Sequence, residues 1–97
     1  MGEKLIRSFR HKGLEAFHEA GSLAGIQPAH KAKLELILTV LDSTASPEEL
    51  QLAGSFSVHK LTGVDRNRWS IKVSRNWRVT FEYSGGDTVL VDYLDYH

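Results

Sequence analysis

The sequence predicts an α+β fold of two layers, in which a short N-terminal strand and two helices pack on a mostly antiparallel, twisted sheet. Two observations predict this arrangement. Helix-type spacing of apolar residues is found in the first half of the chain, after a short N-terminal stretch with strand-type spacing, and strand-type alternation dominates the second half. The 97 residues, of which 41% are hydrophobic and 25% charged, suffice for one core. We therefore expect a single domain over residues 1–97.

The N-terminal elements are a strand followed by a helix. Residues 5–9 place Leu5 and Phe9 on one side by the period of two, which favours a short strand. Residues 11–20 carry Leu14 and Phe17 three positions apart, as on one face of a helix. Gly21 follows as an expected C-cap.

A second helix is expected from Ile26-Gln27-Pro28 to Asp42, with the proline in its first turn. Its core-facing residues follow the spacing i, i+3, i+4, i+7 and are Leu34, Ile37, Leu38 and Leu41. Residues 46–49 read Ser-Pro-Glu-Glu, a capping box that predicts a further short turn of helix through Leu50.

Four strands are expected to follow, over residues 56–61, 69–73, 77–83 and 88–93, with a Ser-Gly-Gly-Asp hairpin turn before the last. Strand alternation assigns one set of side chains to the helix-covered side: Trp69, Ile71, Val73, Trp77, Val79, Phe81 and Tyr83. The other side is expected to be open, concave and basic, and carries Lys72, Arg78, Thr80 and Glu82.

The formal net charge of zero conceals a strongly basic segment. Residues 51–81 hold six lysines and arginines against Asp65 alone, and the segments on both sides are acidic. Such a stretch, interrupted by Trp69, Trp77 and His59, could neutralise phosphates and stack bases. The alternative is an ordinary solvated strand face.

Several classes of function are excluded or disfavoured. The chain has no cysteine, which excludes disulfides, thiolate metal sites and a cysteine nucleophile. No apolar run reaches the length of a membrane helix and no signal peptide is visible, so we expect a cytoplasmic protein that does not contact membranes. His11 and His18 lack the further ligands of a metal site, and His30 is expected to face solvent. We therefore expect no metal and no cofactor.

Five segments in order along the chain resemble the HigB branch of the RelE/ParE toxins. They are residues 7–14 (Arg-Ser-Phe-Arg-His-Lys-Gly-Leu), 58–63 (Val-His-Lys-Leu-Thr-Gly), 69–71 (Trp-Ser-Ile), 76–81 (Asn-Trp-Arg-Val-Thr-Phe) and 92–97 (Asp-Tyr-Leu-Asp-Tyr-His). The resemblance implies the toxin of a type II toxin–antitoxin pair, with a RelE-like, microbial-ribonuclease-like fold, that cuts mRNA in the ribosomal A site. It also implies a helix-turn-helix antitoxin of the HigA type, through which the toxin would reach operator DNA.

Metal-independent cleavage of RNA needs a base, an acid and a cation at the phosphate. His59 and His97 are the candidate acid and base, with the two roles unassigned. Arg78 is the candidate for the scissile phosphate, because a guanidinium binds phosphate as a fork. Asp95 could orient an imidazole, and Tyr96 could stack on a base or bind the phosphate.

Further RNA contacts are expected from residues around these groups. The candidates are Lys60, Arg66, Arg68 and Asn76, although Asn76 could equally fix a turn. Thr62 stands where members of the family often have lysine, so the positive charge would come from Lys60, Arg66 or Arg68.

Two other functions fit the same fold. A ParE-like toxin that inhibits DNA gyrase without catalysis would have no use for His59, Asp95, Tyr96 and His97. A nucleic-acid-binding module would explain the basic face but would leave the two histidines without a role.

Overall fold

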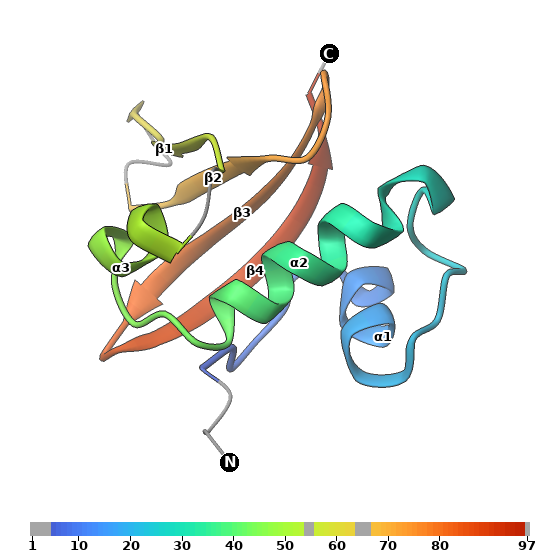
Figure 1. The fold of residues 1–97 in the computed structure, drawn as a ribbon, viewed down its shortest axis with the longest axis horizontal. Helices are drawn as coiled ribbons and strands as arrows, with labels where there is room; N and C mark the ends of the chain where they lie inside the picture. Colours follow the sequence, from blue (N-terminus) through green and yellow to red (C-terminus); the bar gives the residue numbers. More distant parts are fainter. Residues whose placement is uncertain (1–4, 54–55, 64–66, 97) are drawn as a thin grey trace.

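The computed structural model describes residues 5–53, 56–63 and 67–96. Its helices are α1 (Lys12–Ala20), the 3₁₀ turn η1 (Pro28–His30), α2 (Lys31–Leu41) and α3 (Pro47–Ala53). Its strands are β1 (Val58–Lys60), β2 (Trp69–Lys72), β3 (Trp77–Ser84) and β4 (Asp87–Asp95). The strands form one antiparallel sheet in the order β1-β2-β3-β4, so the predicted α+β class is confirmed (Figure 1).

Local capping interactions account for the limits of α1. The His11 ring accepts a hydrogen bond from the Leu14 amide at its start (2.9 Å). Gly21 ends the helix with φ +72°, a left-handed conformation that glycine adopts without strain. The helix turns Leu14 and Phe17 into the core, as their spacing predicted.

The second predicted helix is divided into the 3₁₀ turn η1, which contains Pro28, and α2. The predicted apolar stripe of α2 is buried: Leu34, Ile37, Leu38 and Leu41. Half of the predicted capping box is present: Ser46 Oγ accepts from the Glu49 amide (3.2 Å), whereas the Glu49 carboxylate accepts from the amide of Ala45, the residue before the N-cap. The helix that it begins extends to Ala53, beyond the predicted end at Leu50.

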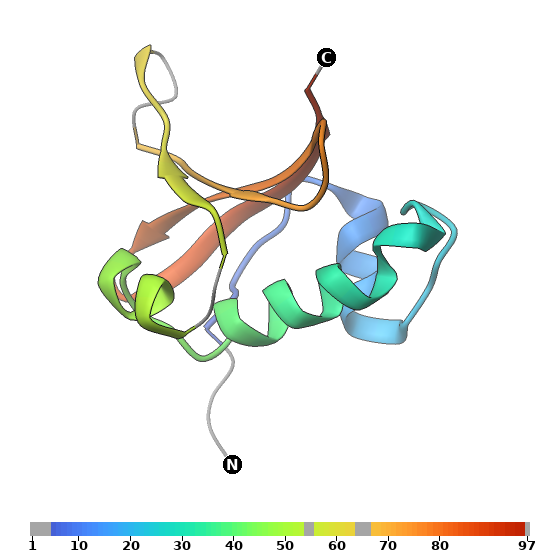
Figure 2. The same ribbon diagram turned by 45° about the horizontal axis from the view of Figure 1, so that its top comes forward.

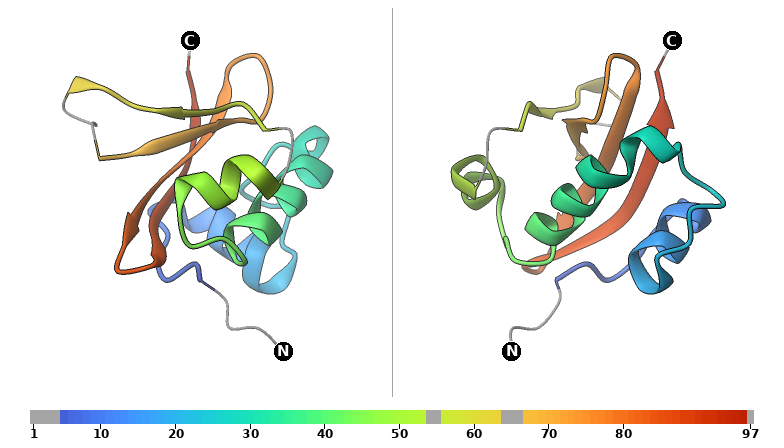
Figure 3. Two further views of the ribbon diagram at one scale, coloured as in Figure 1. Left: turned by 60° about the vertical axis from the view of Figure 1, so that its left-hand side comes forward. Right: turned by 45° about the vertical axis from the view of Figure 1, so that its right-hand side comes forward.

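The helices lie on one side of the sheet, and the strands curve so that the other side is concave (Figure 2). The β1–β2 hairpin extends away from the helices (Figure 3, left). On the helix side Ile71, Val79 and Phe81 are fully buried, as predicted. Half-buried aromatic and aliphatic side chains surround them: Trp69, Val73, Trp77 and Tyr83.

The predicted N-terminal strand over residues 5–9 is wrong. This extended segment makes only two isolated parallel bridges to β4, Ile6 to Thr88 and Phe9 to Val91. The register of β3 with β4 shifts between Thr80 and Glu82, and Leu90 has φ +54°. This β-bulge interrupts β4, and a continuous ladder with a neighbouring strand cannot form across it.

The prediction of an open face is wrong at its centre. Thr80 is 1% exposed and Ser70 is 4% exposed, although both lie on the side without helices. The Arg68 side chain covers this region and donates from Nη2 to Thr80 Oγ1 (2.8 Å). The outer parts of this face remain open, and Lys72 and His59 are exposed there.

Candidate functional site

The register of the sheet places the candidate site residues in two neighbouring rows on the concave face. One row crosses all four strands through His59, Ser70, Thr80 and Asp92. The next row, two residues along each strand, holds Lys72, Arg78 and Leu94. A strand's side chains alternate between faces, so these groups share the side that the helices leave uncovered.

Arg78 is held by the turn that joins β2 to β3. Its Nη1 atom donates to the carbonyl oxygens of Ser74 (3.0 Å), Arg75 (3.4 Å) and Trp77 (3.1 Å). Within the described residues these are all of its hydrogen bonds, so the Nε–Nη2 edge has no partner there. That edge of a guanidinium can bind two oxygens of one phosphate.

Tyr96 lies beside Arg78 at the end of the sheet. The guanidinium carbon is 6.0 Å from the centre of the Tyr96 ring, and the ring is 40% exposed. The Tyr96 amide donates to the Asn76 carbonyl at 2.6 Å. This backbone bond joins the end of β4 to the residue before β3, and the exposed Asn76 side chain is available for contacts.

His59 lies on β1, two strands away from Arg78. It is exposed and pairs with Ser70, whereas Arg78 pairs with Lys72 two residues further along β2. Two strand spacings amount to about 10 Å, so these side chains would reach a shared ligand from opposite sides.

Asp95 lies on the opposite side of the strand from Tyr96. It pairs with Trp77, whose side chain lies on the helix side of the sheet. Burial is the main cause of the raised pKa of Tyr93, and the negative charge of Asp95 raises that pKa further. Two predicted site residues, His97 and Arg66, lie outside the described residues. Asp95 and Tyr96 thus lie on opposite faces of the sheet at the end of β4.

Lys60 does not share a face with His59. Its ammonium lies 5.9 Å from the centre of the Trp69 ring, on the other side of β1. It lines a shallow hollow of about 540 Å³ at the tip of the β1–β2 hairpin with Leu61, Thr62, Gly63 and Asn67. Thr62 stands where members of the resembled family often have lysine. It lines the same hollow as Lys60, which places a positive charge close to it.

The prediction that Arg68 contacts RNA does not fit its environment. Arg68 is 4% exposed, and its guanidinium donates to Glu82 (3.1 Å), Thr80 (2.8 Å) and the Leu90 carbonyl (2.7 Å). A buried cation held by three such partners within the protein is typical of a structural role.

Two features of this region were not predicted as parts of a site. Lys72 is exposed directly opposite Arg78, so two cations sit side by side on the concave face. Strand alternation places Lys72 on this side, and that signal could have identified it. His30 is not solvent-facing as predicted, because it is half-buried and its Nδ1 lies 2.6 Å from the Tyr93 hydroxyl.

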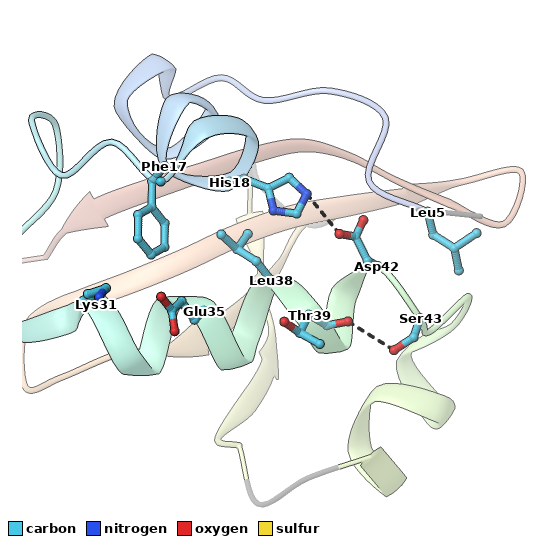
Figure 4. A pocket seen from close by; sticks show the side chains of 10 residues that line it. Leu5, Phe17, His18, Lys31, Glu35, Leu38, Thr39, Asp42 and Ser43 are labelled. Carbon is cyan, nitrogen blue, oxygen red and sulfur yellow. Dashed lines mark hydrogen bonds and ion pairs between the residues drawn. The ribbon is translucent and has the colours of Figure 1, made fainter. Parts of the chain in front are cut away.

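A larger hollow lies on the helical side, between α1 and α2 (Figure 4). His18 Nε2 and Asp42 Oδ2 meet at 2.9 Å in its wall, and Asp42 Oδ1 also accepts from the Ile6 amide. The pair therefore joins α1, the end of α2 and the N-terminal segment. None of the predicted site residues lines this hollow.

The described part of the chain contains no cluster of three or more His, Asp or Glu side chains that could hold a metal ion. Its helices are also too short and too polar for any of them to cross a membrane.

Residues 7–97 match the family described as the RelE-like toxin of type II toxin–antitoxin system HigB. The chain therefore belongs to the HigB-like toxins. It is also 34% identical over 93 residues to the endoribonuclease HigB of Proteus vulgaris, covering 96% of this chain and all of that protein. The protein is thus a toxin of a type II toxin–antitoxin system and a homologue of an endoribonuclease.

Proposed function

We propose that the protein is a cytoplasmic, ribosome-dependent endoribonuclease that cuts mRNA in the ribosomal A site and so stops translation. The concave face carries the cleavage, with Arg78 at the scissile phosphate and Tyr96 beside it. His59 and His97 supply the proton transfers. Lys60, Arg66 and Asn76 contact neighbouring nucleotides, whereas Arg68 holds the sheet together.

The reaction needs no external co-reactant. One histidine takes the proton of the 2′-hydroxyl, and the 2′-oxygen of the ribose attacks the adjacent phosphorus. The bond from phosphorus to the 5′-oxygen breaks, and the other histidine gives that oxygen a proton. The products are a 2′,3′-cyclic phosphate and a 5′-hydroxyl. Asp95 orients the imidazole of His97 and favours its charged form.

The observation that carries this proposal is the arrangement of Arg78 and Tyr96. Three carbonyls of the β2–β3 turn hold Nη1 in place, and the Nε–Nη2 edge remains available. A fixed fork of donors stabilises the negative charge that develops on the attacked phosphate. The half-exposed Tyr96 ring next to it offers a surface on which a base can stack.

Ribosome dependence follows from the small size of the surface. Among the described residues, the exposed cations of this face are Lys72 and the partly exposed Arg78, which can orient few nucleotides. Holding the 2′-oxygen in line with the leaving group is worth several kcal/mol of barrier. The ribosome can supply that orientation by holding the mRNA in the A site.

Its partner is a cognate antitoxin, which we propose to be a helix-turn-helix protein of the HigA type. Such a protein would also connect the toxin to operator DNA. Co-expression of the neighbouring reading frame and co-purification of the two chains tests this pairing directly.

The function is tested with purified toxin on one defined mRNA, either free or programmed into ribosomes, with mapping of the 5′ ends. We expect efficient cleavage only of the ribosome-bound message, and loss of cleavage in His97→Ala. Equal cleavage of free and bound RNA contradicts the ribosome dependence. Unimpaired mRNA together with altered DNA supercoiling in induced cells supports gyrase inhibition instead.

A further inference from the structure

Four aromatic rings pack together where the start of α1, the η1 turn, the start of β3 and the end of β4 meet. We call His11, His30, Trp77 and Tyr93 the Tyr93 cluster. The Trp77 and Tyr93 ring centroids are 4.5 Å apart, and the His11 ring meets Tyr93 edge-on at 5.3 Å. His30 packs edge-on against Trp77 at 5.7 Å. The cluster joins elements that are distant in sequence.

A short hydrogen bond lies at the centre of the cluster. The Gln27 amide donates to the Tyr93 hydroxyl oxygen at 3.4 Å, and His30 Nδ1 lies 2.6 Å from the same oxygen. Burial raises the pKa of Tyr93, so the phenol keeps its proton at neutral pH and can donate it to Nδ1. In that arrangement the imidazole carries its own proton on Nε2.

Tyr93 is the last buried residue of β4. It is 3% exposed, whereas Asp95 and Tyr96 are both exposed. Beyond it the strand is held by its pairing with β3 and by the bond from the Tyr96 amide to Asn76. The cluster therefore attaches β4 to the helices shortly before the chain reaches the proposed catalytic end.

We propose that His30 is a positioning residue, whose hydrogen bond to Tyr93 fixes the end of β4 and thereby holds Tyr96 in place relative to Arg78. This inference rests on the proposed function. His30 lies on the helical layer and does not itself meet RNA. It acts through Tyr93, which stacks on Trp77, the β3 partner of Asp95.

The test compares His30→Leu, which removes the acceptor, with His30→Asn, whose amide oxygen takes the place of Nδ1. Cleavage of ribosome-bound mRNA is measured as kcat and KM. We expect His30→Leu and Tyr93→Phe each to lower kcat about 10- to 100-fold with KM nearly unchanged, because small misplacements of reacting groups have effects of this size. His30→Asn should recover most of the loss. The double variant should lose no more than either single variant.

A second readout does not depend on catalysis. Hydrogen exchange of the Tyr96 amide should become at least about tenfold faster in His30→Leu, because its bond to Asn76 loosens. Exchange of the Thr88 amide, which donates to Leu5 at the other end of β4, should not change. Tyr83→Phe is the matched control, since it makes the same substitution on the same face at the far end of β3.

The outcomes separate the inference from the function on which it rests. If Arg78→Ala and His97→Ala both retain cleavage, the proposed site is wrong, and with it this role of His30. If they lose cleavage while His30→Leu keeps its kcat, the inference alone is overturned. It is also overturned if Tyr96 exchange is unchanged, if His30→Asn does not recover activity, or if Tyr83→Phe causes an equal loss.

Discussion

Arg68 donates a hydrogen bond to the backbone carbonyl of Leu90 at 2.7 Å, at the point where β4 bulges. Leu90 has φ +54°, a conformation that costs a non-glycine residue of order 1 kcal/mol or more. On its other side the Leu90 amide donates to Ser8 Oγ (2.8 Å). Both backbone polar groups of the bulged residue are therefore satisfied by residues remote in sequence, which stabilises the bulge.

Arg68→Ala is expected to lower the free energy of unfolding by about 3–5 kcal/mol, because it leaves Glu82 unpaired and the Leu90 carbonyl without its donor. Urea denaturation measures the change. Arg75→Ala, at an exposed arginine seven residues away, should stay within about 0.5 kcal/mol of wild type. A similarly small change for Arg68→Ala would contradict the structural role.

Arg78→Ala should reduce cleavage of ribosome-bound mRNA about 100-fold or more, the usual scale for removing one charge-stabilising donor. Arg78→Lys should recover only part of this loss, because an ammonium is a point charge and cannot bind two oxygens as a fork. Single-turnover cleavage measures both effects, and Arg75→Ala is again the matched control. Full activity of Arg78→Ala would move the phosphate site elsewhere on the face.

Gly25→Ala should destabilise the fold by about 1–3 kcal/mol. A Cβ atom on Gly25 would lie 2.5 Å from the Cα of Gly13 in α1, so the loop and the helix would have to separate. Thermal unfolding measures the change, and Ala24→Ser at the neighbouring exposed position is the control. Equal melting temperatures for the two variants would show that the contact is readily relieved.

Alkaline pH should destabilise the protein partly through two tyrosines. Burial raises the pKa of Tyr83 and Tyr93 above the ordinary 10.0, and the negative charges of Glu49 and Glu48 add to this at Tyr83. A group with a raised folded-state pKa contributes stability that is complete below its unfolded pKa. That stability is lost as pH rises through the folded value.

The free energy of unfolding should therefore begin to fall above about pH 10, and Tyr93→Phe or Tyr83→Phe should each flatten this fall. Urea denaturation at a series of pH values from 8 upward, at constant ionic strength, gives the slopes. An unchanged slope in both variants would show that other groups cause the alkaline loss.

Much of the fold could be predicted because its signals are local. The apolar spacing of α2, the capping box at Ser46 and the alternation of β3 each depend on neighbouring residues only. The N-terminal segment, by contrast, is extended as expected but does not form a strand. Whether this segment pairs continuously with β4 depends on the bulge at Leu90, and no pattern of neighbouring residues predicts that bulge.

The candidate site, like the fold, was predictable only where its signals are local. Strand alternation predicted that Arg78 lies on the side without helices, where the structure places it, and Tyr96 at the end of β4 lies beside it. Arg68 could not be distinguished from an exposed arginine, because its burial depends on Thr80, Glu82 and Leu90 from two other strands. The bond between His30 and Tyr93 spans 63 residues, which is equally beyond local patterns.

The attachment of the N-terminal segment to β4 also determines when the protein can fold during its synthesis. Ser8 bonds to Leu90, 82 residues later, and the amides of Arg7 and Arg10 donate to Thr88 and Val91. These groups of the N-terminal segment have no such partner until residues 88–91 have been made. Closing such distant contacts makes folding slow and late. A nascent chain therefore cannot complete the attachment of this segment before β4 has been made.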